Sequence, residues 1–386
     1  MKDKIAFVYG DTLLDYHFHE EHPFNQKRVQ LTKELLEETG SLVDDDMIVP
    51  RQATDEELQL YHDPAYVEAV KKAGNNQLND AKALEYGLGT EDTPSFPNMH
   101  EAASWVAGGT LTAVDAVMEN NYDHALHLGG GLHHGFKRKA SGFCIYNDAA
   151  VAIQYIREKY QASVLYVDTD AHHGDGVQWA FYDDPNVCTL SIHETGRYLF
   201  PGTGNIHERG IKAGHGYSFN IPIDAFTEDE SFIQVYEKAF QLIAAFFKPD
   251  IIVTQNGADA HAYDPLTHLS LSMESFERIP LLAHELAHQY SNGKWIALGG
   301  GGYDMWRVAP RAWAQIWNVM RQKNPVYGNI PKTWLAKWQP RSPVQLPTSW
   351  QDDLSTFPKI PRKEIIQEKN AQVLRDALKY AKENIF

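Results

Sequence analysis

The chain has 386 residues, of which 43% are hydrophobic, enough for the core of one large α/β fold. Its formal net charge of −16 disfavours nucleic acid as the main partner, because phosphate binding depends on clustered Lys and Arg. Only two cysteines, a start unlike a signal peptide and no apolar run long enough for a membrane span lead us to expect a cytoplasmic protein without disulfides.

Short apolar segments alternate along the chain with helical patterns. Six apolar runs predict strands: Ile5–Tyr9, Ala125–Leu128, Val164–Val167, Val187–Ile192, Ile251–Thr254 and Trp295–Leu298. Five segments predict helices: Gln26–Glu38, His100–Glu119, Asp148–Lys159, Glu230–Phe247 and Ser275–Tyr290. The alternation predicts an α/β fold with a single open, mostly parallel sheet and helices on both faces. In such sheets ligands bind outside the carboxyl ends of the strands.

The first motif along the chain is a glycine-rich turn, Gly129–Gly135, that carries the adjacent histidines His133 and His134. Glycine allows positive φ and lets a substrate approach the backbone closely. Adjacent histidines in a loop are also compatible with an ordinary exposed turn. The turn by itself therefore leaves a catalytic and a surface interpretation open.

The most informative segment, Asp168–Asp175, follows the predicted strand Val164–Val167 and holds three aspartates and two histidines. Residues two apart on an extended chain point to the same side, so Asp170 and His172 can converge on one point. A carboxylate oxygen and a neutral imidazole nitrogen are ligands for a divalent metal such as zinc. A single Asp or His here could simply cap a helix, but five ionisable groups behind an apolar strand are costly to bury without a metal or a hydrogen-bonded network.

Two carboxylates of this segment, Asp168 and Asp175, are left over for the far ring nitrogens of two histidines. Two such His–Asp pairs beside a metal suit general acid–base hydrolysis. Further along, Asn256–Asp259 ends another predicted strand, and Asp259 would complete a set of two aspartates and one histidine. Such a set leaves a position open for water, which is typical of catalytic zinc. Taken alone, Asn256–Asp259 favours an ordinary glycine-containing turn.

Two later segments suggest other chemistry. His284–His288 matches the HExxH motif of zinc proteases, but no histidine follows it and the next glutamate is Glu364, so a third protease ligand is missing. The same segment reads as part of an amphipathic helix. Gly299–Tyr303 lacks the Lys-Ser/Thr ending and the GxGxxG spacing of phosphate loops. We interpret it as a mobile loop that brings the Tyr303 hydroxyl to a reacting oxygen.

The composition changes near Asn324, where Pro and Trp become frequent and periodicity is lost through Pro361. Arg362–Phe386 then carries apolar residues at helical spacing, the last of them Ile385. This pattern predicts an amphipathic helix that packs on the core or on another subunit, and it leaves the oligomeric state open. We therefore expect a catalytic domain over residues 1–320 and a C-terminal extension over residues 321–386.

Six motifs occur together in one order: GGLHHG (130–135), ASGFCIYND (140–148), DTDAHHGDGV (168–177), FPGTG (200–204), GAD (257–259) and GGGGY (299–303). The ordered set resembles the zinc-dependent histone deacetylase family over roughly residues 5–318. Three further segments, 19–25, 86–94 and 264–270, are similar to bacterial members of that family named for acetoin utilization. The resemblance implies the arginase–deacetylase fold, which agrees with the predicted sheet.

The resemblance also implies roles for individual residues. The family's zinc ligands match Asp170, His172 and Asp259, with Fe²⁺ as the alternative metal. Its catalytic residues match His133 paired with Asp168, His134 paired with Asp175, and Tyr303, which hydrogen-bonds the substrate carbonyl. Its substrate-binding residues match Gly142, Phe143 and Phe200 in the wall of an acyl-lysine tunnel, Leu266 at the rim, Asp92 at the substrate backbone and Arg28 near the acetate exit.

Two structural potassium sites are implied in the same way. The first would use Asp168, Asp170, His172, Ser191 and Ile192, and the second Phe181, Asp184, Val187 and Tyr217. The chain departs from many relatives at Leu199, where they carry an aromatic residue, so we expect a different tunnel rim.

These residues predict zinc-dependent hydrolysis of N-ε-acetyl-lysine on a protein or peptide, with release of acetate. We expect His134 to be the general base and His133 to act mainly through its charge. The resemblance connects the reaction to acetoin and acetate metabolism, with acetyl-CoA synthetase as candidate substrate. Three alternatives stay open: an acetylpolyamine substrate, a non-catalytic sensor of acetylated ligands, and a two-manganese ureohydrolase, whose Asp-Ala-His-x-Asp spacing is missed by one residue at Asp175.

Overall fold

The computed structural model describes residues 3–379 and 381, and its centre is one sheet in the strand order β2-β1-β3-β8-β7-β4-β5-β6. The strands are β1 (Ile5–Val8), β2 (Met47–Ile48), β3 (His124–His127), β4 (Val164–Asp168), β5 (Val187–Glu194), β6 (Ser218–Ile223), β7 (Ile251–Gln255) and β8 (Trp295–Leu298). Every pair of neighbouring strands in the described part is parallel. The predicted open α/β sheet is confirmed.

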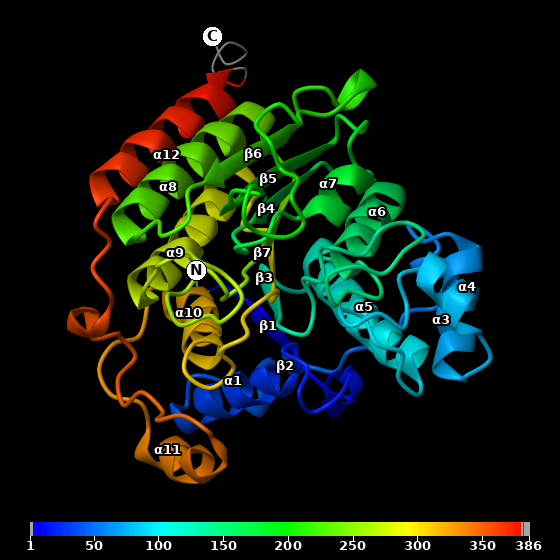
Figure 1. Ribbon diagram of the computed structural model, residues 1–386, viewed down its shortest axis with the longest axis horizontal. Helices are drawn as coiled ribbons and strands as arrows, with labels where there is room; N and C mark the ends of the chain where they lie inside the picture. Colours follow the sequence, from blue (N-terminus) through cyan, green and yellow to red (C-terminus); the bar gives the residue numbers. More distant parts are fainter. Residues whose placement is uncertain (1–2, 380, 382–386) are drawn as a thin grey trace.

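Twelve helices surround the sheet within the described residues. They are α1 (Lys27–Glu38), α2 (Asp55–Leu58), α3 (Pro64–Gly74), α4 (Asp80–Glu85), α5 (Met99–Met118), α6 (Asp148–Tyr160), α7 (Asp175–Ala180), α8 (Asp229–Phe247), α9 (Met273–Tyr290), α10 (Ala309–Gln322), α11 (Lys332–Trp338) and α12 (Lys363–Ala377). Helices α5 and α6 cover one face, and α1, α8, α9 and α10 cover the other (Figure 1). The strands are therefore buried on both sides, as the continuous apolar runs predict.

The central strands end level with one another at their carboxyl ends. Asp168 at the end of β4 is paired with Gln255 of β7, Gln255 with Leu298 of β8, and Leu298 with His127 of β3. The loops that follow these four strands consequently leave the sheet at the same edge. This register brings together segments that are far apart in the sequence.

Some elements have no clear sequence signal. Strand β6 has the sequence SFNIPI, in which Asn and Pro disfavour a strand, but it lies at the edge of the sheet, where the missing N–H of Pro222 is tolerated. Helix α10 is buried on most of its surface, and its polar residues Arg311, Gln315 and Asn318, which stand at helical spacing, are buried as well. The short α7 begins at Asp175, inside the segment interpreted as a metal site.

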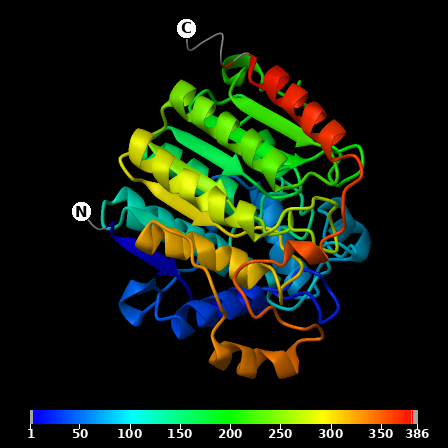
Figure 2. The same ribbon diagram turned by 90° about the vertical axis from the view of Figure 1, so that its left-hand side faces the viewer.

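The C-terminal segment packs on the same body as the sheet. Trp334, Trp338 and Trp350 are buried, and α12 lies beside α8 and the edge strand β6 (Figures 1 and 2). The predicted amphipathic helix is thus present from Lys363 onwards and packs on the core, while Ile385 lies outside the described residues. The domain boundary at 320/321 stays a prediction.

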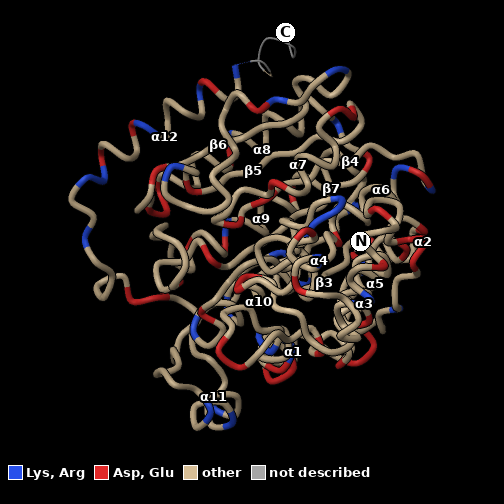
Figure 3. Tube along the Cα trace, turned by 45° about the vertical axis from the view of Figure 1, so that its right-hand side comes forward, with Lys and Arg blue, Asp and Glu red and all other residues tan. Residues whose placement is uncertain are grey.

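Two features of the described residues bear on the expectation of neither a membrane span nor a nucleic-acid partner. No helix among them combines the length and the apolar character needed to cross a membrane. Lys and Arg are interspersed with Asp and Glu along the trace (Figure 3).

Candidate active site

Four loops meet at the carboxyl edge of the sheet. The turn Gly129–Gly135 follows β3, Thr169–Gly174 follows β4, Asn256–Asp259 follows β7 and Gly299–Tyr303 follows β8. All of the histidines and aspartates singled out in these loops are buried. The structure therefore brings together the four segments that the sequence places at strand ends.

The three expected metal ligands converge. The Nδ1 atom of His172 lies 3.0 Å from Asp170 Oδ1 and 3.0 Å from Asp259 Oδ2. Burial opposes a charge on His172, but hydrogen bonds to Asp170 and Asp259 outweigh it and raise the pKa of the imidazole well above its usual value. Burial and the nearby Asp170 raise the pKa of Asp259 to about 6. Asp170, His172 and Asp259, called the trio below, thus carry excess negative charge in a buried environment. Their donor set fits zinc.

Hydrogen bonds to the backbone and to one amide hold the two carboxylates. Asp170 Oδ2 accepts from Gln255 Nε2 at 2.7 Å and from the Gly301 N–H at 2.8 Å. Asp259 Oδ1 accepts from the Ala171 N–H at 2.9 Å. These bonds leave other carboxylate oxygens facing His172. The sequence analysis missed Gln255, whose only signal is a polar residue at the end of an apolar strand.

Each of the two histidines expected to be catalytic is paired with the carboxylate expected for it. His133 Nδ1 lies 2.8 Å from Asp168 Oδ2, His134 Nδ1 lies 2.7 Å from Asp175 Oδ1, and the two Nε2 atoms lie 3.0 Å apart. Burial opposes a charge on His133, but Asp168 and Asp170 raise its pKa to about 9. Burial and the charge on His133 lower the pKa of His134 to about 4. His134 is therefore the neutral member of the pair and can accept a proton.

A buried aspartate that the sequence analysis missed holds the histidine turn. Asp148 accepts from Thr110 Oγ1 at 2.6 Å, from the Gly131 N–H at 2.9 Å and from the Leu132 N–H at 2.8 Å. Asn147 Nδ2 donates to the backbone carbonyl of His133 at 3.1 Å. The adjacent Asn and Asp at the start of α6 were the available signal, since both residue types favour helix N-termini.

A cavity of about 220 Å³ opens above the trio. It is lined by Asp92, His134, Gly142, Phe143, His172, Leu199, Phe200, Leu266 and Tyr303. Phe143 has the left-handed φ of 68°, and its carbonyl accepts from the Tyr16 hydroxyl at 2.7 Å. A Cβ on Gly142 would lie 2.5 Å from the His134 ring, so glycine is required at this position. The expected tunnel residues thus line one cavity, with His134, His172 and Tyr303 exposed to its interior.

Tyr303 is oriented by a carboxylate outside the predicted set. Its backbone N–H donates to Asp264 Oδ2 at 2.8 Å, and its ring meets the edge of Phe143 at 5.6 Å between centroids. Burial, together with Asp259 and Asp170, raises the pKa of the Tyr303 hydroxyl well above its usual value. The hydroxyl therefore stays protonated and can donate a hydrogen bond.

Arg28 lies behind the tyrosine loop and is not among the residues that line the cavity. Its Nη1 atom donates to the Gly302 carbonyl at 3.0 Å, and its guanidinium stacks 4.5 Å from the ring centroid of Phe24. Burial lowers the pKa of Arg28. Its buried charge compensates part of the negative charge of the trio.

The structure gives backbone contacts for several of the residues expected at the two potassium sites. In the first, Asp168 pairs in register with Ser191, next to Ile192 on β5. In the second, the Phe181 carbonyl accepts from the Asp184 N–H at 3.1 Å, and the Tyr217 carbonyl accepts from the Thr189 N–H at 2.9 Å. Each carbonyl oxygen retains a second lone pair for a cation.

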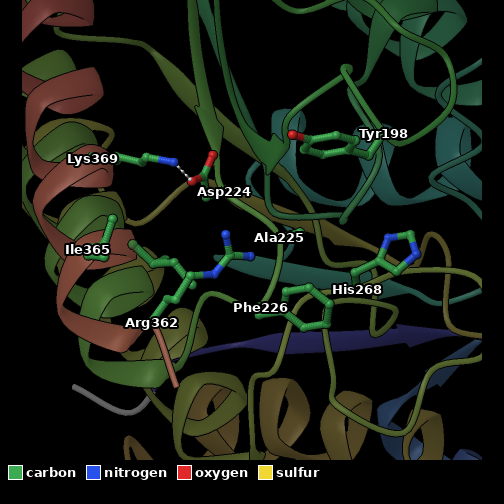
Figure 4. Close-up of a pocket in the computed structure, with 9 residues that line it drawn as sticks. Tyr198, Asp224, Ala225, Phe226, His268, Arg362, Ile365 and Lys369 are labelled. Atoms are coloured by element: carbon green, nitrogen blue, oxygen red, sulfur yellow. Dashed lines mark hydrogen bonds and ion pairs between the residues drawn. The ribbon is translucent and has the colours of Figure 1, made fainter. Parts of the chain in front are cut away.

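A second cavity, of about 430 Å³, lies beside the first, and no sequence motif indicated it. Its lining comprises Tyr198, Asp224, Ala225, Phe226, His268, Arg362, Ile365, Ile366 and Lys369. Figure 4 shows that α12 forms one wall and that Lys369 is paired with Asp224, with an N–O distance of 2.8 Å. Tyr198 directly precedes Leu199 of the first cavity, and His268 follows two residues after Leu266. The C-terminal helix therefore shapes the surface next to the mouth.

Comparisons with known proteins identify similar chains. The histone deacetylase domain matches residues 22–320. "Acetoin utilization protein AcuC" of Bacillus subtilis (strain 168) is 61% identical over 98% of this chain and 97% of its own length. AcuC of Staphylococcus xylosus is 45% identical over 98% of this chain and 99% of its own. The crystal structure of an HDAC homologue complexed with SAHA has a TM-score of 0.82 at 29% identity, over 97% of this chain and 99% of the other. An HDAC homologue from Aquifex aeolicus also has a TM-score of 0.82, at 27% identity over 95% of this chain and 99% of its own.

Proposed function

The chain belongs to the histone deacetylase family, and we propose that this deacetylase hydrolyses N-ε-acetyl-lysine on a protein substrate in a zinc-dependent reaction. One observation carries the proposal. The trio Asp170, His172 and Asp259 lies beneath a narrow cavity into which His134 and Tyr303 also face. A group to hold the metal, a base and a hydrogen-bond donor are thus available to one acetyl group.

The cavity wall suits the substrate side chain. Phe143 and Phe200 line the cavity and offer apolar surface to the four methylenes of a lysine stem. The exposed Asp92 at the mouth can accept a hydrogen bond from a substrate backbone N–H. A zinc ion held by the trio would polarise the acetyl carbonyl and make water a stronger acid.

His134 moves the proton in this proposal. Its neutral Nε2 takes a proton from water as the water oxygen bonds to the acetyl carbon. The same nitrogen returns the proton to the lysine nitrogen as the C–N bond breaks, which releases acetate and a free amine. Tyr303 donates a hydrogen bond to the carbonyl oxygen as negative charge develops on it. The charge on His133 stabilises the same oxygen at longer range.

The two-manganese alternative is not favoured by the position of Asp175. Its Oδ1 atom accepts from His134 Nδ1 at 2.7 Å and from the Gly176 N–H at 2.8 Å. The carboxylate that a second metal would need is therefore engaged with a catalytic histidine.

The surface beside the mouth supports a macromolecular substrate over an acetylpolyamine. The second cavity, with Arg362 in its wall, offers further contacts for the residues that flank an acetyl-lysine in a polypeptide. The names of the relatives suggest a role in acetoin utilization, with acetyl-CoA synthetase as the substrate to test. We also propose potassium at the two sites described above, and a cytoplasmic enzyme, which fits two buried free cysteines.

An assay of acetate release tests this function. The metal-free protein is reloaded with Zn²⁺ or Fe²⁺ and is given acetylated acetyl-CoA synthetase, an acetyl-lysine peptide or an acetylpolyamine. We expect zinc-dependent release from the protein and peptide, inhibited by SAHA, the compound bound to the structural relative. Faster turnover of the polyamine would favour the small-molecule alternative. Binding of the peptide without acetate release would indicate a sensor.

A further inference from the structure

A second group of metal-binding side chains lies at the opposite edge of the sheet. Asp3 precedes β1, His124 begins β3, and His284 and His288 lie one turn apart on α9. Figure 2 shows the strands running away from the N-terminus at the left, so these residues lie at the amino ends of the strands. The active site lies at their carboxyl ends. The group is therefore separate from the catalytic machinery.

Four donor atoms surround one point. The Asp3 Oδ2 atom lies 3.2 Å from His284 Nε2, 3.4 Å from His288 Nε2 and 3.8 Å from His124 Nε2. The Nε2 atoms of His284 and His288 are 3.2 Å apart. Four ligands at about 2.0–2.1 Å from a tetrahedral zinc ion are about 3.3 Å from one another. The separations among Asp3, His284 and His288 therefore agree with the edges of a zinc coordination tetrahedron, and the donor atoms of all four residues lie within 4.8 Å of one another.

One ring nitrogen in this group lacks a hydrogen-bond partner among the described residues. The His124 side chain is fully buried, and its Nε2 atom finds no hydrogen-bond partner among the described residues. Buried polar atoms are ordinarily hydrogen-bonded, so an unpaired ring nitrogen aimed at a carboxylate needs a reason. A cation between His124 and Asp3 supplies one, since it would accept the free lone pair of the nitrogen.

The donor set selects the metal. Three imidazoles and one carboxylate suit a first-row transition ion such as zinc, whereas Mg²⁺ and Ca²⁺ prefer sets of oxygen atoms. The catalytic trio has comparable donor separations of 3.0 Å, but it contributes two carboxylates and only three protein ligands. Four protein ligands fill a tetrahedral site, which is typical of structural zinc.

This arrangement also explains the HExxH motif. His284 and His288 face the same way because they are four residues apart on a helix. Glu285, the base that the motif supplies in zinc proteases, is exposed and is not part of the group. Lys323 Nζ lies 3.1 Å from the same Asp3 oxygen and competes for it, but its side chain is half exposed and free to move into solvent. The motif here is therefore suited to holding a metal and not to hydrolysis.

We propose that Asp3, His124, His284 and His288 bind a second zinc ion, which ties the segment before β1 to β3 and to α9. Zinc that binds the folded chain more tightly than the unfolded chain raises thermal stability, and the rise grows with the ratio of free zinc to the Kd of the site. The site would therefore act as a structural clamp at the edge of the sheet opposite the substrate.

Metal stoichiometry tests the proposal. The metal-free protein is equilibrated with zinc, freed of excess metal and analysed by plasma mass spectrometry. We expect His284→Ala/His288→Ala to bind one equivalent less than the wild type, and the exposed His207→Ala to bind as much as the wild type. This difference does not depend on the catalytic trio, so it is informative even if the proposed function is wrong. Equal zinc content in the double variant and the wild type would overturn the proposal.

A second measurement guards against misfolding of the double variant. His288, whose side chain is 38% exposed, is replaced by Gln in an Asp259→Asn background that weakens the catalytic trio. Zinc should raise the melting temperature of Asp259→Asn, and His288→Gln should reduce that rise while the far-ultraviolet circular dichroism stays unchanged. Cobalt loaded into Asp259→Asn should show the visible bands of a tetrahedral complex. An equal melting shift with and without His288→Gln would contradict the assignment.

Discussion

The Nε2 atoms of His133 and His134 lie 3.0 Å apart, and each ring binds a different buried carboxylate through its Nδ1 atom. A hydrogen bond between two ring nitrogens needs one donor and one acceptor, so a single proton lies between them. Despite burial, Asp168 raises the pKa of His133 to about 9, while burial and His133 lower that of His134 to about 4. At neutral pH the proton therefore belongs to His133, and the Nε2 atom of His134 is the unprotonated acceptor of the pair that can serve as the base.

Replacement of His134 by Ala should reduce kcat about 10²–10⁴-fold, because the proton acceptor is lost. His133→Ala should reduce kcat less, since only a charge at longer range is removed. Steady-state kinetics on an acetyl-lysine peptide measure both effects, and zinc content should match the wild type in each variant. A larger loss in His133→Ala would exchange the two roles.

Tyr303→Phe should lower kcat about 10²–10³-fold, the usual effect of removing one hydrogen-bond donor to a developing oxyanion. The backbone N–H bond to Asp264 does not involve the hydroxyl, so the loop should keep its position. Zinc content and melting temperature should therefore stay at wild-type values. Unchanged turnover would exclude this role for Tyr303.

Gly301→Ala should reduce zinc binding at the catalytic trio. An added Cβ would lie 2.0 Å from Asp259 Oδ2 and 2.8 Å from Asp170 Oδ2, so the carboxylates would have to move. Gly328→Ala is the control, because its Cβ would meet no atom within 4 Å and only its φ of 91° opposes the change. A zinc titration should show weakened binding at one site in Gly301→Ala and wild-type binding in Gly328→Ala.

Asp352→Ala should destabilise the protein and loosen the C-terminal segment. Asp352 accepts from Arg311 Nη2 at 2.8 Å and from His261 Nε2 at 2.9 Å, with side chains at most 3% exposed. Removing one partner of a buried ion pair typically costs about 3–5 kcal/mol, because the other charge stays buried. Chemical denaturation measures the loss, and the exposed neighbour Asp353→Ala, which loses only its hydrogen bonds from Ser355, should destabilise the protein far less.

The same carboxylate gives stability a defined dependence on pH. Although burial opposes its charge, the hydrogen bond from His261 and the ion pair with Arg311 hold the pKa of Asp352 well below its usual value. A depressed pKa stabilises the fold above the unfolded-state value of about 3.9, and this stabilisation is lost as the pH falls below it. The difference in unfolding free energy between wild type and Asp352→Ala should therefore be constant from about pH 8 to 5 and narrow below about pH 4. A difference that already declines near pH 7 would implicate another group.

Local sequence patterns predicted much of the fold and the central residues of the site. Alternating apolar runs and helical periods indicate a parallel α/β sheet because both depend only on neighbours in the sequence. The spacing of Asp170 and His172 likewise follows from two residues of extended chain. The roles of Asp148, Gln255 and Asp264 do not follow from periodicity or spacing, since each acts through contacts with segments elsewhere in the chain.

The sequence alone therefore determined which residue types stand at the strand ends and how those close in sequence are spaced. The tertiary structure decided which of them meet, because the strand order and register place Asp259 against His172 and Asp3 against His284, pairs separated by 87 and 281 residues. Whether His284–His288 is an isolated helical motif or part of a four-ligand group depends on the same long-range packing. No local rule of chain geometry specifies contacts over such separations, since they arise from the burial of apolar surface by the whole sheet.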